Sequence, residues 1–394
     1  MRRFFELFLP RPTRGMLRSG RSYQCRCGRA VFFENSRCPA CHAALGYEPL
    51  LAKVFAIEPI PGAKGWRVAG ETPGACAEYR CCANRDTAAA CNWLVSDIEK
   101  IEATEGLCIA CRLNRTIPDL SVPENGVLWG RIEVAKRRLV SLLLALEIPL
   151  ASRDEDPERG LAFDFLRSPV EGPRVLTGHA GGLITLNIEE AQASTRERIR
   201  ENLNEPYRTV LGHLRHEIGH YYWDRLIPGT PWISDFRRLF GDERTDYGDA
   251  LKRHYAKGPA PDWMKRFVSS YASSHPWEDW AETWAHFLHM ADTLTTALSF
   301  GIDPRQLDLE IESFPRAALY LPEEPEAARF LNFFNSWIGL TAVMNEMSKG
   351  MGLPDFYPFT VPQPVVAKLH FIFVVTRAER DKMQQLKSAK AAVS

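Results

Sequence analysis

Residues 216–220 read His-Glu-Ile-Gly-His, and this pentapeptide decides how the rest of the chain is interpreted. On an α-helix, His216 and His220 are four residues apart and project from one face, so both rings can reach one metal ion. Glu217 lies about 100° further round the helix, which places its carboxylate beside the metal's open position. Zinc-dependent hydrolysis needs this arrangement, because the ion lowers the pKa of a bound water toward about 7 and the carboxylate takes its proton.

The flanking sequence predicts that the motif lies inside a long, partly buried helix. Pro206 suits a first helical position, and apolar or aromatic residues recur at helical spacing as far as Tyr222. The alternative is a surface helix whose two histidines are merely solvated. Histidines and a glutamate on a buried helix need partners, which a metal ion supplies. His213 shares the same face but lies a turn too far to join both ligands, so we expect a hydrogen-bonded core histidine.

A catalytic zinc ion usually has three protein ligands, so a third ligand is expected. One class of zinc hydrolases places a Gly three residues and a His six residues after the motif, and Trp223 and Leu226 at these positions exclude it. A predicted helix over residues 276–290 instead offers Glu278 and Glu282, four residues apart on one face. One can bind zinc while the other accepts the free ring N–H of a liganding histidine. The spacing alone leaves both assignments open.

The combination of His-Glu-x-x-His with Glu-x-x-x-Glu on a later helix resembles the gluzincin metallopeptidases. This resemblance implies that Glu278 is the zinc ligand and that Glu282 supports the ligand shell. Tyr271 precedes Glu278 by seven residues, as a transition-state tyrosine does in lethal-factor-like members, which implies that its hydroxyl stabilises the oxyanion. An ordinary interface tyrosine is the alternative. Asp224, four residues past His220, matches an acidic position that often follows the motif, which implies a supporting role.

A closer resemblance extends over nearly the whole chain from residue 23. Residues 205–224, 239–247 and 276–289 resemble a bacterial family of zinc-binding metallopeptidases with an N-terminal zinc ribbon. The resemblance implies an α+β fold in which a small zinc-ribbon domain precedes a mainly helical, zincin-like metallopeptidase domain. It also implies a peptide or protein substrate, hydrolysed with Glu217 as general base and then general acid.

All ten cysteines lie between Cys25 and Cys111, which is typical of a separate module stapled by metal. We expect two four-thiolate zinc sites, the first cysteine group being Cys25, Cys27, Cys38 and Cys41, and the second being Cys82, Cys91, Cys108 and Cys111. The family pattern favours Cys82 over the adjacent Cys81 and leaves Cys76 and Cys81 as free thiols. The predicted metal content is therefore one catalytic and one or two structural zinc ions. A disulfide framework is the alternative and would require an oxidising compartment.

The N-terminal sequence gives no route to such a compartment. Residues 1–10 contain a six-residue apolar stretch broken by Glu6 and ended by Pro10, too short for a signal peptide and without a small-residue cleavage site. No run of about eighteen apolar residues predicts a membrane span. We therefore expect a cytoplasmic protein with zinc-bound thiolates. Met16 is an alternative start.

Charge and composition bear on partners and on domain organisation. The 49 basic and 49 acidic residues balance, which argues against nucleic-acid binding as the main function. The predicted organisation is a flexible extension over residues 1–22, the zinc ribbon over 23–118, the metallopeptidase domain over 119–382 and a flexible tail over 383–394. The rival hypothesis is a partner-binding protein that acts through its ribbon and whose zincin-like site is structural or inactive.

Further elements of the second domain are predicted from periodicity. Residues 181–188 are predicted to form a strand after a glycine turn. In zinc peptidases of this type, an edge strand near the active-site helix pairs with the extended substrate. An ordinary sheet strand without contact to substrate is the alternative. Helical patterns cover residues 129–146, 330–347 and 365–381. The basic residues Lys136 to Arg138 in the first of these helices are expected to form a solvated face.

Overall fold

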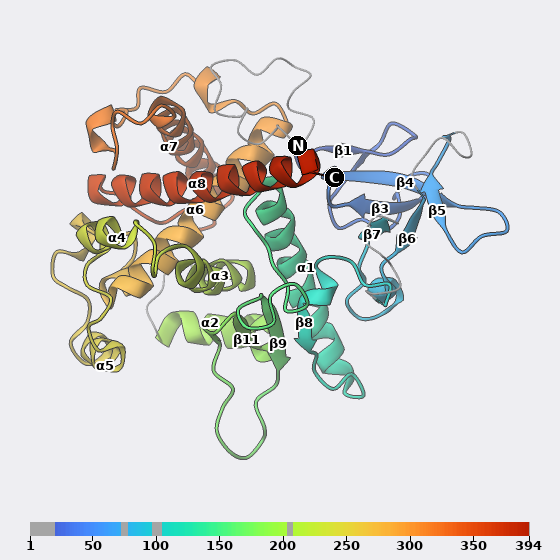
Figure 1. The fold of residues 1–394 in the computed structure, drawn as a ribbon, viewed down its shortest axis with the longest axis horizontal. Helices are drawn as coiled ribbons and strands as arrows, with labels where there is room; N and C mark the ends of the chain where they lie inside the picture. The colour runs from blue at the N-terminus through green and yellow to red at the C-terminus, as the bar shows by residue number, and fades with distance from the viewer. Residues whose placement is uncertain (1–19, 72–77, 97–104, 203–207, 394) are drawn as a thin grey trace.

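The chain divides into a strand-rich N-terminal part and a larger helical part that contains a second sheet (Figure 1). The computed structural model describes residues 20–71, 78–96, 105–202 and 208–393. The predicted α+β class, with a cysteine-rich region before a mainly helical domain, is confirmed. Most of the extension predicted over residues 1–22, and also Cys76, lie outside the described residues.

The N-terminal part contains a small hairpin and a five-stranded antiparallel sheet. The hairpin pairs β1 (Tyr23–Gln24) with β2 (Ala30–Val31). The sheet has the order β3-β4-β5-β6-β7, with bounds Ala44–Glu48, Lys53–Pro59, Trp66–Val68, Tyr79–Cys81 and Leu94–Ser96. Its core is aromatic: the ring of Tyr47 lies 4.7 Å from that of Phe33 and 5.0 Å from that of Trp93, measured between centroids. Strands this short bury little apolar surface, so metal sites can add the stability that the core lacks.

The second sheet has four strands in the order β10-β11-β9-β8. Their bounds are β8 Asn114–Thr116, β9 Ala162–Leu166, β10 Gly178–Ala180 and β11 Leu183–Asn187. Strands β8, β9 and β11 are parallel, and β10 is the antiparallel edge strand. The strand predicted over residues 181–188 is therefore β11, inside the sheet, while the preceding β10 forms the edge. Gly181 and Gly182 connect the two with φ angles of 52° and 82°, a conformation that favours glycine.

Eight helices of the described chain form the remainder of the fold, together with short 3₁₀ turns. They are α1 Pro123–Ala145, α2 Ala193–Asn202, α3 Val210–Leu226, α4 Ile233–Phe240, α5 Tyr247–Lys257, α6 Pro276–Ser299, α7 Ala327–Gly350 and α8 Gln363–Val393. The Thr209 side chain caps α3 by accepting from the backbone N–H of Gly212 at 2.9 Å. The predicted start at Pro206 lies outside the described residues. Pro276 occupies the first turn of α6, where its missing N–H costs nothing.

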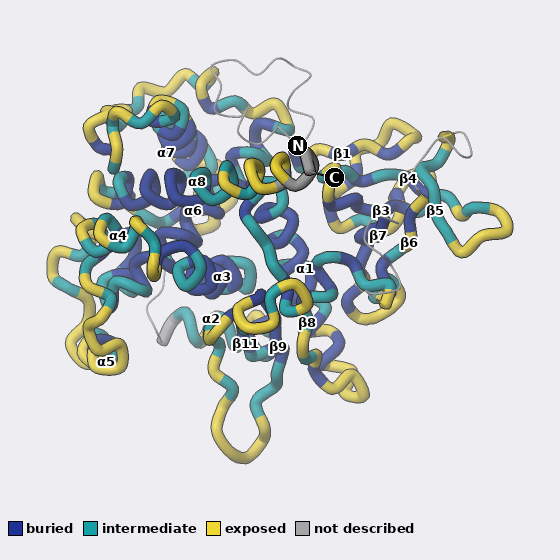
Figure 2. Tube along the Cα trace, in the orientation of Figure 1, coloured by how far each residue is buried: buried dark blue, intermediate teal, exposed yellow. Residues whose placement is uncertain are grey.

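Helices α3 and α6 pack against each other through small residues. A Cβ atom on Gly219 of α3 would lie 2.9 Å from the Cα atom of Ala281 on α6, so only glycine permits this approach. The indole N–H of Trp280 donates to the Gly219 carbonyl at 2.9 Å and fixes the register of the two helices. Both helices are largely buried (Figure 2). This close packing brings the motif on α3 opposite the acidic residues of α6.

The prediction of a solvated basic face on α1 is wrong for Lys136 and Arg137, which are 0% and 2% exposed. The Lys136 ammonium pairs with the Glu133 carboxylate at 2.7 Å, and Arg137 donates to the carbonyl of Ala89 at 2.9 Å. The physical reason is that α1 lies between the two parts of the molecule and is covered by α3 on one side and by the second cysteine region on the other. Periodicity within one helix does not reveal a second covering layer.

Helix α8 extends further than the sequence pattern indicated. The amphipathic pattern ends near Asp381, whereas the helix continues to Val393 across the predicted tail. Residues 382–393 are rich in Lys, Gln and Ala and contain no Gly or Pro, so their intrinsic helix propensity is high. Within the described part of the chain, no helix has both the length and the apolar character required to cross a membrane.

Candidate active site

The two histidines of the motif and Glu278 converge at the contact between α3 and α6. The Nε2 atoms of His216 and His220 are 3.1 Å apart. The Oε2 atom of Glu278 lies 2.9 Å from Nε2 of His216 and 3.5 Å from Nε2 of His220. All three residues are buried. The structure therefore brings together three of the sequence-predicted site residues through one atom each.

This arrangement fits a zinc ion. Tetrahedral zinc with Zn–N and Zn–O bonds of about 2.0 Å places its ligand atoms roughly 3.3 Å apart, and the three separations of 2.9, 3.1 and 3.5 Å bracket this value. Without a cation between them, two imidazole nitrogens and a carboxylate oxygen would direct lone pairs at one another in a buried site. His216, His220 and Glu278 would thus hold the ion, with the three protein ligands typical of a catalytic zinc.

Glu282 lies on the other side of the His216 ring. Its Oε1 atom is 2.7 Å from Nδ1 of His216, and its Oε2 atom accepts a hydrogen bond from the Ser269 hydroxyl at 2.6 Å. Burial alone would raise the pKa of Glu282, but the hydrogen bond from His216 holds it below the ordinary glutamate value. This geometry favours Glu278 as the ligand and gives Glu282 the role of fixing the His216 tautomer.

Tyr247 contacts the site although no sequence pattern predicted a role for it. It is the first residue of α5, which the Asp246 side chain caps, and its hydroxyl donates to Oε1 of Glu278 at 2.6 Å. Burial and the Glu278 carboxylate raise the pKa of Tyr247, so the phenol keeps its proton. One oxygen of Glu278 is therefore occupied, and the other faces the two histidines. Residues 239–247 resembled the metallopeptidase family, but nothing in that stretch indicates which atom Tyr247 meets.

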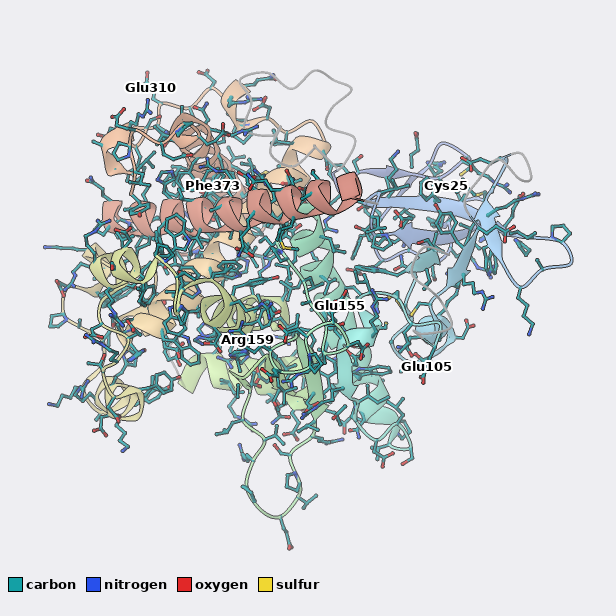
Figure 3. All side chains as sticks on the ribbon, in the orientation of Figure 1. Cys25, Glu105, Glu155, Arg159, Glu310 and Phe373 are labelled. Atoms are coloured by element: carbon teal, nitrogen blue, oxygen red, sulfur yellow. The ribbon has the colours of Figure 1, made fainter. Side chains whose placement is uncertain are left out.

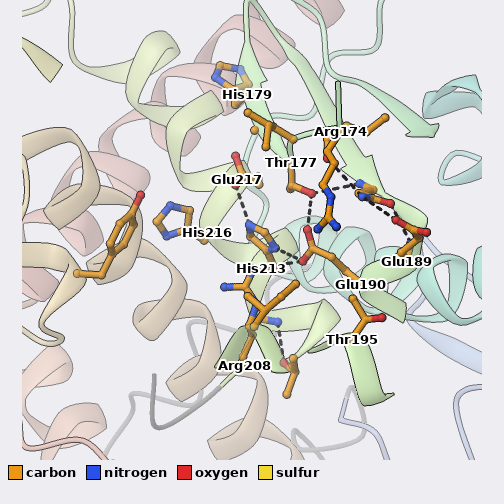
Figure 4. Close-up of a pocket in the computed structure, with 18 of the residues that line it drawn as sticks. Arg174, Thr177, His179, Glu189, Glu190, Thr195, Arg208, His213, His216 and Glu217 are labelled. Carbon is orange, nitrogen blue, oxygen red and sulfur yellow. Dashed lines mark hydrogen bonds and ion pairs between the residues drawn. The ribbon is translucent and has the colours of Figure 1, made fainter. Parts of the chain in front are cut away.

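Glu217 lines the same cleft as the three converging side chains and is held by a series of hydrogen bonds (Figure 4). Its Oε1 atom is 3.1 Å from Nε2 of His213, while its Oε2 atom is buried and has no hydrogen-bond partner among the described residues. Nδ1 of His213 is 2.6 Å from Oε2 of Glu190, and the hydroxyl of Thr177 donates to Oε1 of Glu190 at 2.5 Å. His213 is hydrogen-bonded, as expected, but its contact with Glu217 was not predicted.

The charged side chains of this hydrogen-bonded series, Glu190, His213 and Glu217, stabilise one another. Burial would lower the pKa of His213, yet the carboxylates of Glu190 and Glu217 raise it to about 9. Burial would raise the pKa of Glu217, but His213 holds it below its ordinary value. Burial would also raise the pKa of Glu190, but His213 lowers it to about 2. At neutral pH, Glu217 is therefore an ionised carboxylate that can accept a proton.

Tyr271 and Asp224 occupy less decisive positions. The ring centroid of Tyr271 lies 5.9 Å from that of His216, and the residue lines the same cleft. The carboxylate of Asp224 lies 3.8 Å from Nδ1 of His179 on β10. Nδ1 of His220 is buried with no hydrogen-bond partner among the described residues, so Asp224 does not hold this ring here. The oxyanion role of Tyr271 and the supporting role of Asp224 stay predictions.

The remaining histidines near α6 make contacts outside the ligand set. His275 caps α6 by accepting from the backbone N–H of Trp277 at 3.1 Å. Nδ1 of His286 lies 2.5 Å from the hydroxyl of Tyr357, and Nδ1 of His289 lies 2.6 Å from the Arg215 guanidinium.

A cleft of about 1230 Å³ opens onto the three converging side chains. Its walls come from α3 and α6, from α2, from one face of α5, and from residues 167–179, which include the first two residues of the edge strand β10 and the loop before it. Val170 and Leu176 in this loop are exposed apolar side chains. A cleft of this volume can take several residues of an extended peptide.

The comparisons with known proteins agree with this geometry. Residues 125–375 match a family described as "Putative zinc-binding metallo-peptidase", and residues 22–122 match a zinc-ribbon domain. The chain belongs to this metallopeptidase family. Uncharacterized proteins of Mycobacterium bovis and Mycobacterium tuberculosis are each 40% identical to it over 357 residues, which cover 90% of this chain and 95% of theirs. No solved structure is significantly similar. The predicted family, with its N-terminal ribbon, is confirmed.

The zinc-ribbon domain of this chain contains the two cysteine groups as thiols. Sγ atoms are 3.6 Å apart between Cys25 and Cys41, and 3.7 Å apart between Cys91 and Cys108. A disulfide requires about 2.05 Å, whereas tetrahedral zinc with Zn–S bonds of about 2.3 Å places sulfurs roughly 3.8 Å apart. Both groups therefore fit zinc rather than disulfides, and Cys25 lies among the N-terminal strands (Figure 3). The second group contains Cys82 and leaves out Cys81.

Proposed function

We propose that this metallopeptidase-family chain is a gluzincin-like zinc peptidase that hydrolyses peptide bonds. The observation that carries the proposal is the convergence of His216, His220 and Glu278 on one point with the ionised Glu217 beside it. A zinc ion bound there lowers the pKa of a coordinated water and polarises the substrate carbonyl. One catalytic and two structural zinc ions per chain would account for the three clusters of ligands.

Residues of the chain would provide proton transfer, oxyanion stabilisation and substrate binding. Glu217 takes the proton of the attacking water and delivers it to the leaving amine. Tyr271 lines the cleft beside His216, from where its hydroxyl would donate to the oxyanion of the tetrahedral intermediate. The edge strand β10 contacts α3, and an extended peptide that adds to its open side would pass in front of the histidines.

The compartment and partners follow from the same features. Thiol clusters that hold zinc persist in a reducing environment, so we place the protein in the cytoplasm. The substrate is a peptide or protein in extended form, because strand addition needs an accessible backbone. The ribbon would serve to bind a protein partner, while the balanced charge argues against nucleic acid.

The substitution Glu217→Gln tests the proposal. The amide cannot accept the proton, so cleavage of an unstructured protein such as casein should fall by about two orders of magnitude or more. Zinc content should stay at the wild-type value because Glu217 is not a ligand. The same change at Glu197, exposed on α2 and outside the cleft, is the control and should alter neither quantity.

Two outcomes would count against the proposal. Undiminished cleavage by the Glu217→Gln variant would remove the general base from the mechanism. A zinc-loaded wild type that cleaves neither casein nor a mixed peptide library would favour the rival hypothesis, a partner-binding protein whose zinc site is structural.

A further inference from the structure

The Glu217 carboxylate is contacted by the His213 side chain. Glu217 is 4% exposed, and His213 Nε2 lies 3.1 Å from its Oε1 atom. The Oε2 atom, buried without a hydrogen-bond partner among the described residues, remains for the chemistry. A carboxylate fixed through one oxygen presents the other in a defined direction, whereas an unfixed carboxylate rotates between several.

His213 can hold Glu217 because it donates from both ring nitrogens. Nδ1 faces Glu190 at 2.6 Å while Nε2 faces Glu217, and ionised carboxylates only accept hydrogen bonds. Both contacts are made at once when the ring carries two N–H groups. Such charge-assisted bonds are shorter and stronger than neutral ones. Glu190 thus acts as a buried counter-charge that keeps the ring in place between the two carboxylates.

Glu190 is itself anchored to the strand at the edge of the cleft. The Thr177 hydroxyl donates to Oε1 of Glu190 at 2.5 Å and accepts from the backbone N–H of Asn187 at 3.1 Å. Thr177 directly precedes β10, whose first residue is Gly178. A series of hydrogen bonds therefore connects the edge strand to the general base, through the side chains of Thr177, Glu190, His213 and Glu217 (Figure 4).

We propose that His213, supported by Glu190, is a positioning residue for Glu217 and ties the direction of the general base to the strand that takes the substrate. The inference rests on the proposed function, because it needs Glu217 as the base. A misplacement of about 1 Å in a reacting group can cost roughly 100-fold in rate, which sets the size of the expected effect. Because His213 contacts the Glu190 and Glu217 carboxylates rather than the backbone of β10, we expect the loss in kcat rather than in KM.

The pair His213→Leu and His213→Gln tests the inference. Leucine fills similar space without a donor, whereas the glutamine amide can still reach Glu217 with an N–H. We expect His213→Leu to lower kcat for casein-derived peptides by about 100-fold, with KM and zinc content near wild-type values. His213→Gln should recover about tenfold or more of this loss. Glu190→Gln, which keeps one acceptor oxygen but removes the second acceptor and the counter-charge, should fall between wild type and His213→Leu.

The outcomes separate this inference from the proposed function. If Glu217→Gln abolishes cleavage while His213→Leu retains wild-type kcat, the positioning role is wrong and the peptidase assignment stands. If His213→Leu loses zinc or thermal stability, and His213→Gln loses them equally, His213 is a structural residue and the inference is also overturned. If the wild type does not cleave at all, both proposals fail together.

Discussion

At the scale of residues, each carboxylate of the site uses its two oxygens for different purposes. Glu278 receives the Tyr247 hydroxyl on one oxygen and directs the other at the histidines. Glu282 is shared in the same way between His216 and Ser269. In the part of the chain that the structure describes, Glu217 has one oxygen bonded to His213 and the other without a hydrogen-bond partner. Each carboxylate is thereby prevented from rotating, which is how a buried site keeps its geometry before substrate arrives.

The substitution Tyr247→Phe tests whether the hydrogen bond to Oε1 of Glu278 strengthens zinc binding at the other oxygen. Loss of the hydroxyl leaves Oε1 of Glu278 without its donor, and loss of such a supporting contact typically weakens metal binding by about 10–100-fold. Competition with a chromophoric zinc chelator measures the affinity of the catalytic site. Tyr255→Phe on the same helix, with a side chain 59% exposed, should bind zinc as wild type does. Equal affinity in the Tyr247→Phe variant would show that the contact is incidental.

The sequence predicted the site residues that lie at fixed local spacing and missed those that meet through the fold. His216, Glu217 and His220 were predicted from their spacing on a single helix, and Glu278 was assigned as a ligand from the resemblance to gluzincin metallopeptidases. Glu190 lies 23 residues before His213, and Tyr247 lies 31 residues before Glu278. No periodicity connects such pairs, because their contact depends on how a sheet and three helices are assembled.

At the scale of elements, the site depends on the distance between α3 and α6. The helix that became α3 was predicted from apolar periodicity, which is local, whereas the helix over residues 276–290 was predicted because the site needs a third ligand from a later helix. The edge strand β10 was not predicted, since three residues carry too little pattern and strand pairing defines the element. Gly219 sets the approach of the two ligand helices, because any side chain there would meet the backbone of α6 at Ala281.

Gly219→Ala should separate the two helices. Its Cβ atom would lie 2.9 Å from Cα of Ala281, and overpacking of this kind costs about 1–3 kcal/mol in stability. We expect a lower thermal midpoint and weaker binding of the catalytic zinc. Gly350→Ala in α7, where nothing lies within 4 Å of the added atom, is the matched control and should be neutral or gain up to about 1 kcal/mol. A Gly219→Ala variant as stable as wild type would contradict this account of the packing.

At the scale of the whole molecule, the two parts are joined by buried charges as well as by α1 and β8. The Asp292 carboxylate on α6 is 3.1 Å from Arg21 of the N-terminal part, 2.7 Å from Arg138 of α1 and 2.7 Å from Arg215 of α3. The cysteine distribution predicted the separate ribbon. The cysteine distribution could not predict the cluster of Asp292 with its three arginines. These four residues are spread over 271 positions, and in the sequence each one resembles an ordinary surface charge.

Asp292→Asn should weaken the whole assembly. Burial would raise the pKa of Asp292, but the three arginines hold it well below the ordinary value, so its contribution is complete above about pH 4 and is lost only as pH falls below that. Removal of the charge at pH 7 leaves three guanidinium groups facing a neutral amide, which costs about 3–5 kcal/mol. Urea denaturation of the zinc-loaded protein at pH 7 measures the loss. A change below about 1 kcal/mol would mean that the junction is not a main source of stability.

The central claim is that one zinc ion, distinct from those of the ribbon, performs hydrolysis at His216, His220 and Glu278. The most direct measurement is zinc per chain, together with casein cleavage, for the wild type and the double variant His216→Ala, His220→Ala. The account predicts that the double variant holds one zinc ion fewer than the wild type and has no cleavage activity. Equal zinc content, or cleavage that survives the loss of both histidines, would contradict it.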